Sequence, residues 1–252
     1  MAVPAIHIFG LDGIPEVRAG DDLVELLVSA LESSELELRD DDVLVITQKI
    51  VSKAEGRLVD LTTIEPSTIA KTFAEAWDKD ARQVEVVLRE SARVVRMERG
   101  VMITETHHGF ICANAGVDAS NVPDTDQVCL LPLDSDESAR RIRAGLSERL
   151  GVAPAIIISD SFGRPWRKGI INIAIGSAGM EIVTDYRGQI DSGGHELKVT
   201  VMAVPDELAS AAELVHGKLD GRPVAVIRGY PYVKGDGRAT DLVLEREKDL
   251  FP

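Results

Sequence analysis

The chain has 252 residues, of which 42 are acidic and 28 are Lys or Arg, so its formal net charge at pH 7 is −14. A field of that sign repels phosphate backbones and anionic lipids, so we expect neither nucleic acid nor a membrane among its partners. Phosphorylated small molecules stay allowed, because a few local cations or a metal ion can reverse the sign within one cleft.

The N-terminal half mixes helix and strand patterns. In chain order they predict a strand at 5–9, a helix at 22–31, a strand at 43–47, helices from 66 to about 77 and over 81–91, and strands at 94–97 and 101–104. Asp21 is placed to cap the first helix, and Pro66 and Ser67 open the second. The polar segment QKIVSKAEGR directly follows the apolar strand at 43–47, which is unusual for a chain that leaves a core strand.

The C-terminal half begins with residues 107–121, which are rich in Gly, Asn and Asp and carry no helix signal. The remaining patterns predict a helix at 135–150 closed by Gly151, a strand at 155–158, a Gly-rich stretch to about 194, a strand at 197–203, a helix at 205–215 and a strand at 224–228.

Strands and helices do not alternate strictly along this chain. We therefore predict an α+β fold with mixed or antiparallel sheets and flanking helices, rather than a doubly wound parallel sheet. Residues 1–252 contain no linker or repeat, so we expect a single catalytic unit, or two subdomains that are interleaved rather than joined by a hinge.

The sequence shows no sign of export or membrane insertion. Its N-terminus lacks the basic and apolar regions of a signal peptide, and its apolar runs are too short to span a bilayer, so we expect a cytoplasmic protein. Cys112 and Cys129 could form one disulfide, but reduced, packed thiols are the favoured interpretation.

Several familiar motifs are missing. The chain contains neither a G-x-x-x-x-G-K-[ST] loop nor a G-x-G-x-x-G turn, and it lacks G-x-S-x-G and H-E-x-x-H. Any phosphate site must therefore be assembled in another way, and the usual signatures of serine hydrolases and zinc proteases are excluded.

Residues 113–122, ANAGVDASNV, combine small side chains with oxygen donors. Small residues let a ligand approach the backbone closely, and Asp118 and Asn121 could bind a metal ion. A turn in which these side chains bond their own backbone explains the same pattern, so both interpretations stay open.

Residues 159–169, SDSFGRPWRKG, place an acid and a hydroxyl at the end of a buried strand, with cations just after it. Asp160 would hold Mg²⁺ next to phosphate, and Arg164, Arg167 and Lys168 would face an anionic substrate. The alternative is a surface loop with solvated arginines.

Other polar residues give weaker signals. Lys53, soon after the strand at 43–47, could act as a point charge on phosphates or be solvated. The pair His107 and His108 has no third ligand at metal spacing, so we expect no zinc site. Glu213 and the other acids of the helix at 205–215 need no role beyond helix-dipole effects and solvation.

Taken in order, eight segments resemble the coenzyme F420:γ-glutamyl ligase family over nearly the whole chain. They are QKIVSKAEGR, ETHHGFICANAGVDASNV, LLPLDSDESARRIR, IISDSFGRPWRKG, AIGSAGM, HELKVT, ELVHGKLDG and VIRGY. The resemblance implies a GTP-dependent amide ligase that adds L-glutamate to F420-0, and then γ-linked glutamates, through an acyl phosphate. It also implies Mg²⁺ or Mn²⁺, with two divalent ions expected, and it leaves open whether K⁺ is bound as well. The family forms an intertwined homodimer, so we expect one here.

The resemblance also assigns residues by position. Asp118 and Asp160 match the family's metal-binding aspartates, and Ser161 matches a metal-contacting hydroxyl, so we expect Ser161 to be a ligand rather than a nucleophile. Arg164 joins Asp118, Asp160 and Lys53 as a candidate catalytic residue because of its charge. The expected nucleotide contacts are Ile14, Pro15, Glu16, Val17, Gln48, Lys53, Asn121, Gly217 and Lys218.

Two positions depart from the family pattern. Some members carry a glutamine metal ligand near Lys218, and a protonated lysine cannot coordinate, so the second metal would bind differently here or Lys218 would contact phosphate directly. Gln48 stands where several relatives have a hydroxyl. Two alternatives remain: a related nucleotide-dependent amide ligase acting on another carboxylate cofactor, such as a folate, and a non-catalytic GTP-binding module.

Overall fold

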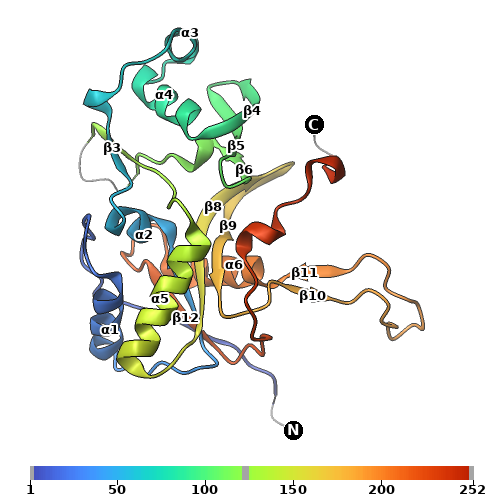
Figure 1. Ribbon diagram of the computed structural model, residues 1–252. Coiled ribbons are helices and arrows are strands. Elements are labelled where there is room, and N and C mark those ends of the chain that lie inside the picture. Colours follow the sequence, from blue (N-terminus) through green and yellow to red (C-terminus); the bar gives the residue numbers. More distant parts are fainter. Residues whose placement is uncertain (1–2, 121–124, 250–252) are drawn as a thin grey trace.

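The computed structural model describes residues 3–120 and 125–249 (Figure 1). Asn121, an expected nucleotide contact, lies outside these residues. The helices are α1 (Leu23–Ser33), α2 (Gln48–Ala54), α3 (Thr68–Trp77), α4 (Ala81–Arg89), α5 (Ser135–Leu150) and α6 (Val204–His216). The strands are β1 (His7–Gly10), β2 (Val43–Thr47), β3 (Leu58–Asp60), β4 (Ser91–Glu98), β5 (Val101–Thr106), β6 (Ile111–Ala113), β7 (Gln127–Cys129), β8 (Ala155–Arg164), β9 (Arg167–Ala178), β10 (Val183–Asp185), β11 (Val201–Ala203) and β12 (Val224–Arg228).

A five-stranded sheet in the order β1-β12-β2-β8-β9 forms the centre of the molecule. β2 and β8 run parallel, with Val45 opposite Ile157, whereas the other neighbours in this sheet are antiparallel. A mixed sheet flanked by helices confirms the predicted α+β class. In the described residues no helix is long and apolar enough to cross a membrane.

Both faces of the central sheet are covered by helices. Successive side chains of a strand point to opposite faces, so Leu44 and Ile46 pack with α1 and α5, whereas Val43 and Val45 pack with α6. The central strands β2 and β12 are almost continuously apolar because neither of their faces meets water. This packing fixes the positions of β2, β8 and β9, which carry or precede polar residues of the pocket described below.

A third cluster of buried apolar residues lies at the top of Figure 1. It joins α3 and α4 to the antiparallel sheet β4-β5-β6, with Met102 and Val128 fully buried. The adjoining pair β3-β7 leads back toward α2. Cys112 and Cys129 are both buried and free, which confirms the prediction of reduced thiols.

Three predicted features of local structure are wrong. Asp22 rather than Asp21 caps α1, because its carboxylate accepts hydrogen bonds from the N–H groups of Val24 and Glu25. The strand predicted at 197–203 covers only the three residues of β11, at the base of an arm that extends from the body (Figure 1). The strand predicted at 155–158 continues as β8 to residue 164 and pairs with β9, which occupies much of the stretch expected to be irregular.

Candidate active site

A pocket of about 680 Å³ opens where the ends of several elements meet. Its size lies within the range of roughly 300–1,000 Å³ that is usual for small-molecule sites. The lining segments come from residues 14–17, the start of α2, the loop from β6 to Ser120, the middle of β8 and β9, and the end of α6 with the loop that follows it.

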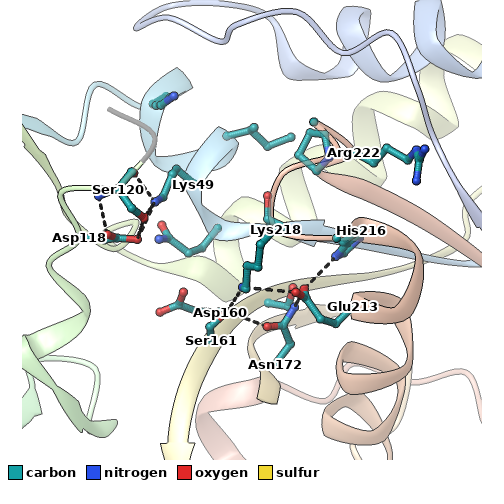
Figure 2. Close-up of a pocket in the computed structure, with 18 of the residues that line it drawn as sticks. Lys49, Asp118, Ser120, Asp160, Ser161, Asn172, Glu213, His216, Lys218 and Arg222 are labelled. Atoms are coloured by element: carbon teal, nitrogen blue, oxygen red, sulfur yellow. Dashed lines mark hydrogen bonds and ion pairs between the residues drawn. The ribbon is translucent and has the colours of Figure 1, made fainter. Parts of the chain in front are cut away.

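Lys49 and Asp118 form an ion pair on one side of the pocket (Figure 2). Lys49 lies in the first turn of α2, and its Nζ donates to Asp118 Oδ2 at 2.5 Å, Ser120 O at 2.6 Å and Ser120 Oγ at 3.0 Å. The Asp118 carboxylate also accepts from the Ser120 N–H at 2.7 Å. Burial alone would raise the pKa of Asp118, but the hydrogen bonds from Lys49 and Ser120 outweigh it and hold that pKa below its usual range. Asp118 thus bonds the backbone of its own segment, as the turn interpretation predicts, and its side chain still lines the pocket.

Asp160 lies within β8 and points toward the side of the pocket that holds Asp118 (Figure 2). Burial raises the pKa of Asp160 to about 6, and the Asp118 carboxylate adds to this increase. The Ser161 N–H and the ammonium groups of Lys49 and Lys218 act in the opposite direction. Because the Asp118 carboxylate raises the cost of ionising Asp160, a cation shared by the two would favour the charged form of Asp160.

A chain of hydrogen bonds crosses the other side of the pocket. Lys218 Nζ donates to Ser161 Oγ at 2.7 Å, and the Ser161 hydroxyl donates to Asn172 Oδ1 at 2.8 Å. The Asn172 amide donates in turn to Glu213 Oε2 at 2.8 Å, and Glu213 Oε1 lies 3.4 Å from Lys218 Nζ. Ser161 and Asn172 face each other because they are partners in the β8-β9 register. The buried His216 borders this group, and burial lowers its pKa.

The expected nucleotide contacts from residues 14–17 and from α2 also line the pocket. Lys53 is buried, with a side chain only 5% exposed, and its Nζ lies 2.5 Å from Glu16 Oε1. Gln48 accepts a hydrogen bond from Ser52 Oγ at 2.8 Å, so its own amide N–H groups are left for other partners. Both side chains line the pocket together with residues 14–17.

The structure brings most of the predicted site together, with three exceptions among the described residues. Every expected metal ligand and every expected nucleotide contact within the described residues lines the pocket. Arg164, however, lies at the end of β8 and is absent from the described lining, as are Arg167 and Lys168 at the start of β9. The three cations expected to face the substrate thus belong to a hairpin tip outside the pocket.

Several polar residues of the pocket were not assigned to the site from the sequence, among them Lys49, Asn172, Glu213 and His216. The expectation that Glu213 lies on an exposed helix face is wrong, because it faces the pocket beside Asn172. His216 and Lys218 follow Glu213 by three and five residues, at the end of the predicted helix. Three ionisable residues grouped there could have indicated a polar site. Asn172 gave none, since the strand that holds it was not predicted.

Asp118 and Asp160 fit a divalent cation. Both supply hard oxygen donors, and Mg²⁺ is usually held in proteins by one or two carboxylates together with phosphates and water. In the described residues no group of three His, Cys, Asp or Glu side chains gathers at metal-binding distance. The two aspartates would therefore hold an ion that draws its remaining ligands from substrate and solvent.

Comparison with known proteins finds one matching family model and several similar full-length sequences. The family model for F420-0:gamma-glutamyl ligase matches residues 13–229. A coenzyme F420:L-glutamate ligase from Methanothermobacter thermautotrophicus is 45% identical over 249 residues, which cover 98% of each chain. The proteins of the same name from Methanopyrus kandleri and Methanocaldococcus jannaschii are 47% and 40% identical, covering 94% and 98% of this chain and 93% and 96% of their own. These matches confirm the resemblance inferred from the sequence.

Proposed function

The chain belongs to the F420-0:gamma-glutamyl ligase family, and we propose that it joins L-glutamate to F420-0 at the expense of GTP, and then adds further glutamates through γ-linkages. The pocket itself is the strongest support. It sets four cationic side chains, Lys49, Lys53, Lys218 and Arg222, among the carboxylates of Glu16, Asp118, Asp160 and Glu213, within a chain of net charge −14. Such a site suits several anionic substrates that must be brought together.

We assign the nucleotide to the wall formed by 14–17, Gln48 and Lys53. Lys53 is held by Glu16 and is the most deeply buried of the pocket lysines, so its charge is fixed before any ligand arrives. A fixed ammonium next to a triphosphate needs no reorganisation when charge develops. Gly217 and Lys218 would approach the same nucleotide from the loop after α6.

The proposed chemistry has two steps. A carboxylate oxygen of F420-0 attacks the γ-phosphorus of GTP, GDP leaves, and an acyl phosphate forms. The amine of glutamate then attacks the acyl carbon, phosphate leaves with the bond electrons, the amine loses a proton, and an amide results. A divalent cation held by Asp118 and Asp160 would supply neutralisation of the phosphate charge. The chain's own residues position the reactants, and no protein nucleophile is needed.

The hydrogen bonds of Ser161 agree with this division of roles. Its hydroxyl already donates to Asn172 and accepts from Lys218, so no base is positioned to take its proton. We therefore expect no covalent enzyme intermediate.

We further propose that the protein acts as a homodimer, as the resemblance implies. The β10-β11 arm extends from the body in Figure 1 and exposes Ile190, Val199 and Val201 to solvent. Apolar residues on an extended arm are costly to leave in water, and a second copy would cover them. Sedimentation should give a dimer for the wild type and a monomer for Val199→Asp. A wild-type monomer at micromolar concentration would contradict this proposal.

Ligation is tested by mixing the protein with F420-0, GTP, Mg²⁺ and L-glutamate and following the products by mass spectrometry. We expect glutamylated F420, with GTP consumed in proportion to the amide bonds formed. No added glutamate with either Mg²⁺ or Mn²⁺ would refute the activity. A folate offered in competition separates the alternative acceptor, and GTP binding without glutamate-dependent GDP release would identify a non-catalytic module.

A further inference from the structure

The side chain of Ser161, where the resemblance implies a metal contact, already contacts a cation. Ser161, expected as a metal ligand, accepts a hydrogen bond from Lys218 Nζ at 2.7 Å. The same hydroxyl donates its proton in a hydrogen bond to Asn172 Oδ1 at 2.8 Å. A hydroxyl has one proton and two lone pairs, so a single lone pair of Ser161 remains.

Geometry limits how far a metal on that lone pair could stay from the ammonium. Mg²⁺ binds oxygen at about 2.1 Å, and Lys218 Nζ lies 2.7 Å from the same atom. Two cations on one oxygen can be no farther apart than the sum of these distances, about 4.8 Å. The charges would repel each other strongly, and Ser161 carries no negative charge to offset them.

The charges around Lys218 are already balanced. Glu213 Oε1 lies 3.4 Å from its Nζ, and Glu213 Oε2 is occupied by the Asn172 amide at 2.8 Å. One carboxylate thus faces one ammonium on this side of the pocket, whereas on the other side two carboxylates, Asp118 and Asp160, face the single ammonium of Lys49 (Figure 2). A divalent cation is favoured by the second arrangement and not by the first.

Lys218 is also placed to reach a ligand. It directly follows Gly217, which ends α6 with φ of +59°, so the chain turns sharply and the lysine side chain extends back over β8. The side chain is 56% exposed to the open pocket. Its ammonium can therefore touch phosphate oxygens while it stays bound to Ser161.

We propose that the Lys218 ammonium takes the place of the second metal ion, so that this protein binds one divalent cation per active site, at Asp118 and Asp160. The inference rests on the proposed function, which supplies the anionic substrate that both cations face. It predicts that the metal stoichiometry is set by the residue at position 218.

The test counts Mn²⁺ by electron paramagnetic resonance in the full-length protein with GDP bound. We expect one tightly bound ion per wild-type chain, with the spectrum of an isolated Mn²⁺. Lys218→Gln should bind two ions and show the dipolar broadening of a close pair, whereas Lys218→Arg, which keeps the charge, should bind one. Circular dichroism checks that the variants are folded. We expect them to fold, because the side chain at position 218 is largely exposed.

Two results would overturn the inference. Two tightly bound ions in the wild type would show that Lys218 does not replace a metal, and one ion in both the wild type and Lys218→Gln would show that the ammonium is not what excludes it. The product assay separates this inference from the proposed function. If the wild type ligates glutamate with two bound ions, the proposed function holds and the inference about Lys218 fails. If it binds one ion and does not ligate, the inference about Lys218 holds and the proposed function fails.

Discussion

Removing the charge of Lys49 should strengthen metal binding in the absence of nucleotide. Lys49 Nζ holds Asp118 Oδ2 at 2.5 Å, so an incoming cation must displace an ammonium that already neutralises its ligand. Lys49→Met removes this competitor. The carboxylate keeps its orientation, because the N–H and Oγ of Ser120 still donate to it at 2.7 and 2.8 Å.

The size of the effect follows from the contact and its exposure. A hydrogen bond to a charged group contributes about 1.5–3 kcal/mol, and the 42% exposure of Asp118 favours the lower end. Since about 1.4 kcal/mol is a factor of ten in affinity, we expect Mn²⁺ to bind Lys49→Met roughly tenfold more tightly than the wild type.

The assay is a Mn²⁺ titration of nucleotide-free protein, followed by the electron paramagnetic resonance signal of the free ion. Lys49→Arg keeps a cation that can bind the Asp118 carboxylate and should therefore not strengthen Mn²⁺ binding. Lys168→Met removes a lysine from the tip of the β8-β9 hairpin, outside the pocket, and should change nothing. Unchanged or weaker Mn²⁺ binding in Lys49→Met would refute the competition for Asp118.

Three further predictions concern catalysis and stability. Asp160→Asn should abolish ligation with a native circular dichroism spectrum, whereas Glu98→Gln, far from the pocket, should keep the wild-type rate; equal rates would refute the metal assignment. Asp136→Ala removes a fully buried carboxylate that accepts five hydrogen bonds, so urea unfolding should show a loss of about 3 kcal/mol, and a loss below about 1 kcal/mol would contradict this. Hydrogen bonds from Ser67, and then Arg89, lower the pKa of Glu85 to about 2 from 4.5. The stabilisation is therefore complete above pH 4.5 and is lost as the pH falls toward 2, so the advantage of the wild type over Glu85→Gln, about 1 kcal/mol at pH 7, should shrink between pH 5 and pH 3 in urea titrations.

Local sequence signals predicted the elements whose ends are marked by neighbouring residues. The helix at 135–150 has the predicted bounds, because Asp134 caps its start and Gly151 ends it with φ of +72°. The strands at 43–47 and 224–228 are also as predicted, since each is a short apolar run buried on both faces. β9 could not be predicted in this way, because its order comes from pairing with β8.

The residues of the candidate site also differ in whether their own segment marks them or only a distant contact does. Asp118 and Asp160 could be proposed from their segments, because an acid among small or buried residues is chemically unusual. Lys49 could not, since its significance lies in a contact with a residue 69 positions away. Glu213 was misjudged because helical periodicity shows which residues share a face but not what that face meets.

The most direct test of the proposed activity follows one oxygen atom. F420-0 labelled with oxygen-18 in its reacting carboxylate is incubated with the protein, GTP, Mg²⁺ and L-glutamate, and the released phosphate is analysed by mass spectrometry. An acyl phosphate requires one labelled oxygen in the phosphate for each first amide bond formed. Glutamylated product accompanied by unlabelled phosphate would contradict the acyl-phosphate route, and the absence of product would contradict the ligase activity itself.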